Sequence, residues 1–480
     1  MRHGIQDTTI SDNVVLVRCQ NRRFNWSLPH QPETMPESTA SAFWMRYAGR
    51  SWLVTCYHAI GDSYHITIES TKDGAIRTPC HVLFGCPILD IAVLEPDTES
   101  TGVHVRTPFT PLQLRSSPSS ISGPPIGCAT LAVGFPLGQT HLKITRGILS
   151  GQQNDMYQTD APINPGNSGG PLLWEGRVIG VNARMSFMAN DVGYAIPIHR
   201  VLFLLDSGFR DPCIPFPRNW GVSYNPPSDC SKHGVEIISV YPDQLMSSTS
   251  LRPGDVWTHV DGSPISSLGE LSKRWLGQKL SLANYLTHIP FGHRVQIRFR
   301  RGKQSLTDVF VMRPEHPAIV YHECFNERAP IPYLYAIGLV MVPVCENILR
   351  HRGTLLKNTL FRTDVEDPIL EPTVDLHNSA ILQCADPENW STGRIIVTNV
   401  LKGSRVDKHH LFKIGDILVR INGKPVHTIA DVLRSFMRPS RTILLTMASG
   451  RKAVFDRESI RKEELVLQKL HKYTPNMTMF

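Results

Sequence analysis

A single serine, Ser168, lies in a glycine-rich segment, residues 159–171, that reads TDAPINPGNSGGP. Glycine has no Cβ, so the backbone around Ser168 is free to adopt positive φ angles and to approach a ligand closely. Such a turn is able to aim the N–H groups of Gly166 and Ser168, which flank Asn167, at one point. The oxyanion of a tetrahedral acyl intermediate would lie at that point. The residue types therefore favour Ser168 as a nucleophile beside an oxyanion hole.

Two predicted strands position this turn. Residues 172–174 and 178–181 are apolar and are joined by Glu175-Gly176, a pattern typical of a hairpin. A glycine-rich turn between strands is most often only a turn. A serine hydroxyl is also a poor nucleophile unless a base activates it and a further group orients that base.

Histidine is the usual base near neutral pH, and the chain has 20 of them. His58 is the best candidate because it follows a β-rich run at residues 51–57 and precedes the small residue Ala59. His65 and His81 lie within alternating patterns and are interpreted as residues on the face of a strand.

The carboxylate that orients the base is expected at the edge of a strand, shielded from water. Asp90 fits because apolar residues flank it on both sides in PILDIAVL, residues 87–94, and a charge in such surroundings needs a partner. Asp62 is too close to His58 in the chain to lie on a separate strand, and Asp97 follows a proline in a polar loop. The predicted triad is therefore His58, Asp90 and Ser168, one of several chain orders in which this geometry occurs.

These motifs resemble those of the HtrA/Deg (protease Do-like) serine endopeptidases. The similarity covers about residues 40–205, and we place the chain nearest the plant-type branch, with a PDZ and a Do-like C-terminal PDZ module. It is carried by residues 90–94, 133–138, 144–150, 160–171, 178–182 and 193–197.

The resemblance implies an ATP-independent endopeptidase that cleaves unfolded or damaged proteins and needs no cofactor or metal. It assigns the triad to His58, Asp90 and Ser168, and the oxyanion hole to the backbone at 166–168. Substrate pairing falls to Asn182, Ala183 and Arg184. It also implies a homo-oligomer built from trimers or similar rings. The alternative is a chaperone-like protein that holds peptides with little or no proteolysis.

Two departures from the family concern the support of His58. The family usually has Gly-Ser-Gly-Phe where residues 40–43 read ASAF, and Thr-Asn-Xaa where residues 55–57 read TCY. Cys56 is a rival nucleophile, but it lacks a glycine turn of its own. Residues 137–142 and 187–192 correspond to loops that switch the family's sites on and off.

Composition and charge bear on which partners and which compartment we expect for the protein. The 480 residues carry a net charge of +8, but the basic residues are spread along the chain, so a nucleic-acid surface is not favoured. No apolar run is long enough to span a membrane, and the first residues lack the core of a signal peptide, so we expect an intracellular protein in cytoplasm or nucleus. Ten cysteines without metal-binding spacing are expected as buried thiols.

The second half of the chain contains a repeated phrase. Residues 251–265 and 412–426 both place Gly-Asp before a strand and Asp-Gly or Asn-Gly after it, which indicates two copies of one module similar to PDZ domains. In the first copy, residues 220–223 are the candidate carboxylate-binding loop. The C-terminal segment 459–473 is predicted to be a helix with Ser459 as its N-cap.

The predicted fold is therefore mainly β. A trypsin-like double β-barrel protease domain at 1–212 is followed by two PDZ-like α+β domains, at 213–320 and at 321–480 with the C-terminal helix.

Overall fold

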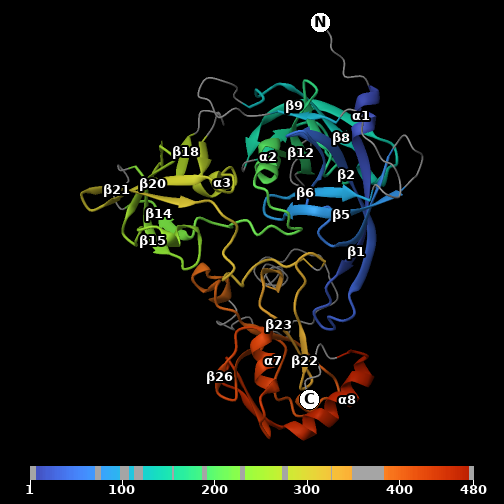
Figure 1. Ribbon diagram of the computed structural model, residues 1–480, viewed down its shortest axis with the longest axis vertical. Helices are drawn as coiled ribbons and strands as arrows, with labels where there is room; N and C mark the ends of the chain where they lie inside the picture. The colour runs from blue at the N-terminus through green and yellow to red at the C-terminus, as the bar shows by residue number, and fades with distance from the viewer. Residues whose placement is uncertain are drawn as a thin grey trace. The chain divides into compact units, whose positions relative to one another are not determined.

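The computed structural model describes residues 7–70, 77–97, 108–112, 123–153, 156–185, 192–227, 233–272, 279–325, 327–348 and 383–474. The chain forms two compact units (Figure 1). The first comprises Met1–Asn21 and Met35–His316, and the second Arg22–Thr34 and Pro317–Phe480. Among the described helices, none has the length and apolar character that a membrane crossing requires.

The first unit begins with a short helix, α1 (Asp7–Asn13), and a closed six-stranded barrel. The strands run in the order β1-β2-β3-β6-β5-β4, and β1 pairs with β4 to close the barrel. Phe43 and Phe84 are fully buried among its core residues. The strands are β1 (Val14–Arg23), β2 (Glu33–Tyr47), β3 (Arg50–Thr55), β4 (Ser63–Glu69), β5 (Arg77–Cys86) and β6 (Ile91–Pro96).

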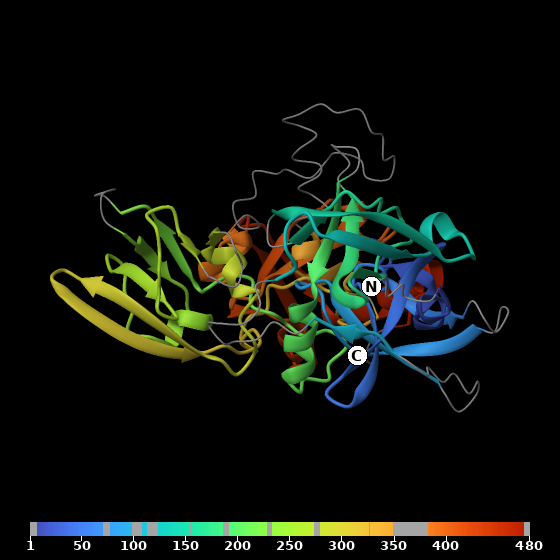
Figure 2. The same ribbon diagram turned by 90° about the horizontal axis from the view of Figure 1, so that it is seen from above.

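A seven-stranded sheet follows, in the order β11-β8-β9-β10-β13-β12-β7, and it closes because β11 also pairs with β12. It lies next to the first barrel in both views (Figures 1 and 2). The elements are β7 (Thr110–Pro111), β8 (Ala129–Gly134), η1 (Pro136–Gly138), β9 (Lys143–Gln153), β10 (Met156–Thr159), β11 (Pro171–Trp174), β12 (Arg177–Met185), β13 (Gly193–Pro197) and helix α2 (Ile198–Asp206). The predicted hairpin around Glu175-Gly176 is confirmed as β11–β12.

The remainder of the first unit is a six-stranded sheet with the main order β14-β15-β16-β20-β21. In β20 the side chains alternate, because Val295, Ile297 and Phe299 are buried while their neighbours face solvent. This region contains β14 (Val222–Asn225), β15 (Val235–Val240), η2 (Leu245–Ser248), β16 (Val256–Val260), β17 (Ser263–Pro264), β18 (Glu270–Ser272), β19 (Lys279–Ser281), α3 (Leu282–Leu286), β20 (Arg294–Arg301) and β21 (Gln304–Val311).

The second unit is built on a seven-stranded sheet with the main order β22-β23-β24-β25-β27-β28. Three of its helices contribute Val406, Phe436 and Ile460 to the hydrophobic core that they share with this sheet. Its elements are β22 (Leu334–Ala336), β23 (Leu339–Pro343), η3 (Pro387–Asn389), β24 (Ile395–Val400), α6 (Arg405–Lys408), β25 (Ile417–Ile421), β26 (Lys424–Pro425), α7 (Ile429–Met437), β27 (Thr442–Met447), β28 (Lys452–Asp456) and α8 (Arg457–His471).

The repeated phrase forms the same local structure twice. The side chain of Asp255 accepts a hydrogen bond from the N–H of Arg252, and that of Asp416 accepts one from Lys413. In each copy the following strand ends in a two-residue turn with positive φ at both positions, Asp261-Gly262 and Asn422-Gly423. This is the hairpin turn that the sequence predicted.

The mainly β fold with a trypsin-like double barrel is confirmed, whereas the three domain boundaries and the PDZ-like identity of the two later sheets stay predictions. One detail was wrong. The C-terminal helix begins at Arg457, and its N-cap is Asp456, whose carboxylate accepts from the N–H of Ser459. An aspartate caps more favourably there because its charge also interacts with the helix dipole.

Candidate active site

The candidate base and its orienting carboxylate come from adjacent strands. Strands β3 and β6 are paired, with Thr55 opposite Ala92. His58 follows the end of β3 and Asp90 directly precedes β6, so strand pairing brings the two residues together although 32 positions separate them. Asp90 has a φ of 56°, in the left-handed region that an aspartate tolerates better than most residues.

Asp90 contacts His58 at two points. Its Oδ2 lies 2.7 Å from the imidazole Nδ1, and its Oδ1 accepts a 2.8 Å hydrogen bond from the His58 backbone N–H. The second bond fixes the carboxylate, so the first orients the imidazole ring. The side chains are 47% and 30% exposed, respectively, so Asp90 is less shielded from water than its apolar neighbours in the sequence suggested.

The nucleophile turn depends on glycine at two positions. Gly166 has a φ of 99°, and a Cβ there would lie 2.3 Å from the carbonyl oxygen of Phe135. Gly169 has a φ of 84°, and its Cβ would lie 2.1 Å from the carbonyl oxygen of Ser41. Both distances are shorter than real Cβ contacts, so only glycine fits without displacement of the backbone.

The backbone hydrogen bonds of this turn leave two N–H groups unused within the described structure. The N–H of Asn167 donates to the carbonyl of Asn164, and that of Gly169 donates to the carbonyl of Asn182. Within the described part of the chain, the N–H groups of Gly166 and Ser168 have no hydrogen-bond partner. Two donors on alternate residues are therefore available to a negatively charged oxygen. The Asn167 side chain is buried and contributes no donor to the surface.

The turn packs against the segment that carries His58, because a Cβ on Gly169 would lie 3.1 Å from the backbone nitrogen of Cys56. The hydroxyl of Ser168 donates a 2.8 Å hydrogen bond to the carbonyl of Ala183. A hydroxyl has one proton, so Ser168 does not donate to His58 in this conformation. Rotation of its side chain must precede proton transfer to the imidazole.

The three predicted substrate-binding residues differ in their surroundings. The side chain of Asn182 is fully buried and donates to the carbonyls of Val133 and Pro171, so it supports the barrel. Ala183 lies at an irregularity between β12 and β13, where its carbonyl is directed to Ser168. The side chain of Arg184 and the loop residues 186–191 lie outside the described residues.

Cys56 is unsuited to act as a rival nucleophile. It is fully buried, and its thiol donates to the carbonyl of Asn182 at 3.2 Å. Burial, with the nearby charge of Asp90, raises the pKa of the thiol well above its usual range, so the reactive thiolate is disfavoured. One side-chain atom from each of Cys56, His58 and Asp90 lies within 4.8 Å of the other two, a spacing that is also found around metal ions. In this arrangement, however, His58 and Asp90 contact each other directly.

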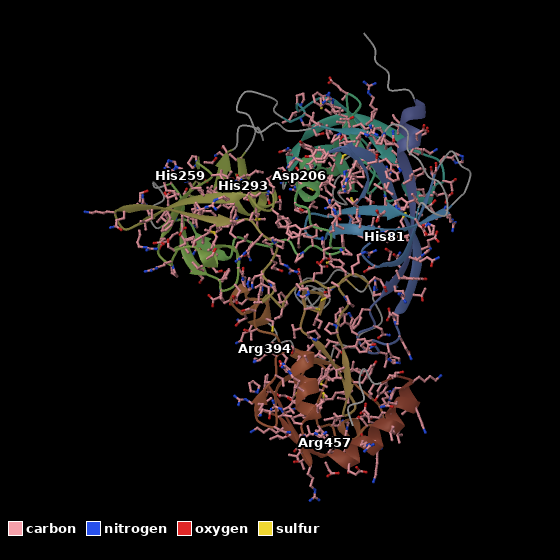
Figure 3. All side chains as sticks on the ribbon, viewed as in Figure 1. His81, Asp206, His259, His293, Arg394 and Arg457 are labelled. Atoms are coloured by element: carbon pink, nitrogen blue, oxygen red, sulfur yellow. The ribbon has the colours of Figure 1, made fainter. Side chains whose placement is uncertain are left out.

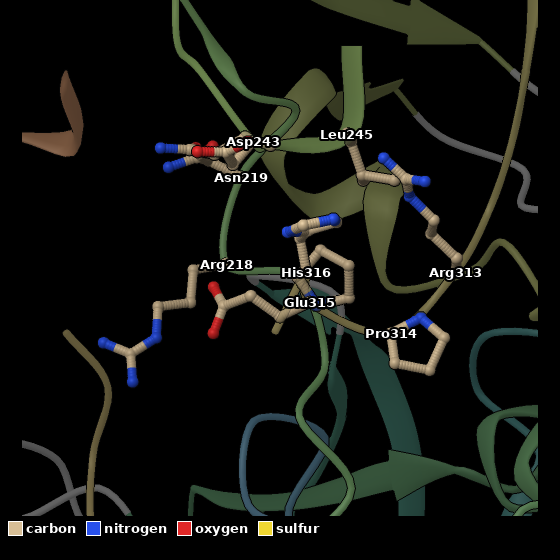
Figure 4. Close-up of a pocket in the computed structure, with 10 residues that line it drawn as sticks. Arg218, Asn219, Asp243, Leu245, Arg313, Pro314, Glu315 and His316 are labelled. Atoms are coloured by element: carbon tan, nitrogen blue, oxygen red, sulfur yellow. The ribbon is translucent and has the colours of Figure 1, made fainter. Parts of the chain in front are cut away.

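Other candidates are located elsewhere. His81 is exposed on β5 and pairs with Glu95 at 2.8 Å, as expected of a residue on the face of a strand (Figure 3). A shallow pocket includes none of the predicted site residues (Figure 4). Burial raises the pKa of Glu315 in this pocket to about 7, and the charge of Arg218 opposes the shift. Its lining comprises Pro217, Arg218, Asn219, Asp243, Gln244, Leu245, Arg313, Pro314, Glu315 and His316.

Sequence reasoning missed Ser41 as part of the site. This buried serine contacts the nucleophile turn through its side chain and its backbone. The available signal was the motif at residues 40–43, where a serine stands between two small residues before Phe43. A small hydroxyl residue in a tightly packed motif fits a buried hydrogen bond.

The sequence of the chain is similar to those of several known proteases. The trypsin-like peptidase domain family matches residues 40–181. "Protease Do-like 2, chloroplastic" from Arabidopsis thaliana is 26% identical over 373 residues, which cover 72% of this chain and 57% of the relative. "Putative serine protease HhoA" from Synechocystis is 27% identical over 241 residues, 42% of this chain and 61% of the relative. The chain thus spans less than two thirds of the length of these relatives.

A solved serine endoprotease from Yersinia pestis is 21% identical, with a TM-score of 0.44, and the match covers 64% of this chain and 96% of that one. A DegP-like endoprotease from Halomonas elongata is 30% identical over 233 residues, 42% of this chain and 48% of the relative. Plant and bacterial relatives match at similar identity, so the plant-type branch stays a prediction. The matched domain is trypsin-like and the curated relatives are Do-like serine proteases, so these findings support the resemblance to the HtrA/Deg family.

Proposed function

We propose that this protein is a serine endopeptidase in which His58, Asp90 and Ser168 form the triad. Asp90 holds the imidazole with Nδ1 toward the carboxylate, and His58 then removes the Ser168 proton as the hydroxyl attacks a peptide carbonyl. The oxyanion is bound by the N–H groups of Gly166 and Ser168. The proposal rests chiefly on one observation, the two-point contact of Asp90 with His58 beside a turn that has two available donors.

The proposed substrates are unfolded or damaged proteins, and the proposed substrate-pairing strand is residues 182–184. Support comes from the curated relatives, which are proteases by name. A homo-oligomer of trimers or similar rings is also part of the proposal, and light scattering coupled to size-exclusion chromatography tests it. A mass of about 54 kDa in solution would contradict it, since the chain itself has a mass of 53.8 kDa.

The decisive experiment compares Ser168→Ala with the wild-type protein on fluorescently labelled unfolded casein. Removal of the nucleophile should lower turnover by several orders of magnitude, roughly 10⁶-fold in the best-studied case. Ser207→Ala is the matched control, because this hydroxyl donates only within helix α2, to the carbonyl of Leu204. Unchanged cleavage by Ser168→Ala, at unchanged thermal stability, would refute the proposal.

A protein that holds unfolded chains without cleavage is the second candidate. The hydrogen bond from Ser168 to Ala183 favours it, because a serine held in this way is not activated. A fluorophosphonate probe distinguishes the two, since it labels only a serine with a competent base. Labelling of wild-type protein but not of Ser168→Ala supports the protease, and no labelling in the presence of unfolded casein supports the holding protein.

A further inference from the structure

The oxyanion turn is held by hydrogen bonds to four successive carbonyl groups. Leu137 N–H donates to Pro165 at 2.6 Å, and Gly170 N–H donates to Asn167 at 3.0 Å. The other two carbonyls, of Gly166 and Ser168, are both bound by Ser41. In a trans peptide the N–H points away from the preceding carbonyl. Anchoring the Pro165 and Asn167 carbonyls therefore turns the N–H groups of Gly166 and Ser168 to the opposite side.

Every polar group of Ser41 makes a hydrogen bond in or beside the site. Its hydroxyl donates to the carbonyl of Gly166 at 2.7 Å and accepts from the N–H of Phe135 at 2.9 Å. Its backbone N–H donates to the carbonyl of Ser168 at 2.8 Å. Its own carbonyl accepts from the hydroxyl of Thr55, which lies on the strand leading to His58, also at 2.8 Å.

The surroundings leave no substitute for the Ser41 hydroxyl. Ser41 is fully buried, and a Cβ on Gly134 would lie 2.7 Å from its Oγ, so a water molecule has little space to replace it. Gly166 is a glycine in the left-handed region, where rotation of the flanking peptides meets little steric resistance. Loss of the hydroxyl would leave the buried carbonyl of Gly166 without its donor, and an unsatisfied buried carbonyl favours rearrangement.

We propose that Ser41 is a positioning residue for the oxyanion hole. Its hydroxyl holds the Gly166–Asn167 peptide so that the N–H groups on either side of it, of Gly166 and Ser168, converge on the reacting oxygen. The inference rests on the proposed protease function and goes beyond it. Ser41 does not touch substrate, so it affects the stabilisation of the transition state more than the binding of the ground state.

The test uses Ser41→Ala in the full chain, with the concentration of competent sites fixed by fluorophosphonate titration. The substrate is a peptide spanning a cleavage site mapped in casein. Loss of a true oxyanion donor lowers kcat by about 10²–10³-fold, and loss of its anchor should cost less, so we expect about a 10- to 100-fold fall in kcat. KM should change by less than about threefold, because only interactions that strengthen in the transition state are lost.

A peptide aldehyde gives the second readout, because its adduct with Ser168 carries the negatively charged oxygen. Its affinity for Ser41→Ala should fall by the same factor as kcat/KM. Thr130→Val is the matched control. It removes another buried hydroxyl of the first unit, one that contacts Thr159 at 3.0 Å outside the site, and should leave kcat and aldehyde affinity within about twofold of wild type.

Ser41→Cys keeps the side-chain size but weakens the donor, so it tests the same point if the alanine variant does not fold. It should give a kcat between those of serine and alanine. The role of Ser41 would be overturned if both variants had wild-type kcat and aldehyde affinity per titrated site. If the alanine variant does not fold, the same result in the cysteine variant alone would overturn it. Either result would leave the protease function standing. Absence of cleavage by the wild-type protein would instead contradict the proposed function itself.

Discussion

Two glycine-containing turns of the first unit were both expected to bind negative charge, and they differ in whether their donors are available. In the turn at 166–170, neighbouring groups occupy the carbonyls and leave two N–H groups without partners in the described structure. In the second turn, the candidate carboxylate-binding loop at 220–223, the N–H of Gly221 donates to the side chain of Asn219 at 2.7 Å. The carbonyls of Trp220 and Gly221 are also occupied, by the N–H groups of Met246 and Tyr241.

The difference shows that glycine permits an anion-binding turn but does not create one. Trp220 is buried against Trp257 and Tyr285, and its indole N–H donates to the carbonyl of Leu282. The second turn is thus built into a core and its Gly221 N–H is occupied, while the first keeps two N–H groups without partners in the described structure. Peptide binding by the 220–223 loop stays a prediction, and the occupied N–H of Gly221 is a physical obstacle to it.

The largest expected effect tests the chemistry beside the first turn. Asp90→Asn keeps the size of the side chain but presents an amide to Nδ1, which favours the wrong tautomer of His58. In another triad this change lowers kcat about 10⁴-fold, and we expect a similar fall here in casein cleavage. Asp97→Asn, an exposed carboxylate just after β6, is the control and should retain full activity. A loss below tenfold for Asp90→Asn would contradict the orienting role.

The second prediction concerns the backbone of the first turn. Gly169→Ala combines a positive φ with severe overlap against Ser41, so the free energy of unfolding should fall by about 3 kcal/mol or more. Gly49 has a similar φ of 76° but nothing within 4 Å of an added Cβ. Gly49→Ala should therefore cost only about 1 kcal/mol. Equal losses in urea denaturation would show that contact with Ser41 is not the cause.

The third prediction concerns a pair of buried histidines that joins the regions carrying the two turns. His199 on α2 and His288 after α3 are buried and share a 2.6 Å contact between Nε2 and Nδ1. Burial lowers the pKa of His199 to about 3, and burial with the adjacent His199 and Arg200 lowers the pKa of His288 well below its usual value.

The unfolded chain therefore binds more protons than the folded one below about pH 6.5, so stability falls as the pH falls. For His199 alone the loss at pH 5 is about 2 kcal/mol relative to pH 7. Urea denaturation at the two pH values measures it, and His288→Gln should reduce the difference. If the slope is unchanged by this substitution, the histidine pair is not its source.

The smallest expected effect probes the second turn directly. Asn219→Ala releases the N–H of Gly221, which becomes able to donate to a peptide carboxylate. One hydrogen bond to a charged group corresponds to about a tenfold gain in affinity for peptides with a free C-terminus over amidated ones. Fluorescence anisotropy with the two peptide forms measures this ratio. Asn225→Ala, at the exposed last residue of β14, should leave the ratio unchanged. An unchanged ratio in Asn219→Ala would place the obstacle in the buried Trp220 instead.

Some features followed from local patterns. The hairpin around Glu175-Gly176 and the repeated turns at 261–262 and 422–423 depend on neighbouring residues, so their sequence signals were sufficient. The contact of Asp90 with His58 was also expected, because an isolated acid among apolar residues needs a partner. Capping of the last helix was misjudged because Asp456 and Ser459 both fit an N-cap and only the backbone conformation selects between them.

The sequence by itself determined which side chains are available for acyl-transfer chemistry, and that a glycine turn presents Ser168 near a strand. The tertiary structure alone decided which backbone donors of the nucleophile turn are left for a ligand. Ser41 lies 125 residues from Gly166 and holds its carbonyl, whereas Asn219 lies only two residues from Gly221 and occupies its N–H through a local contact. A hydrogen bond between distant segments forms only where those segments pack together, and the local order of residues does not encode that packing.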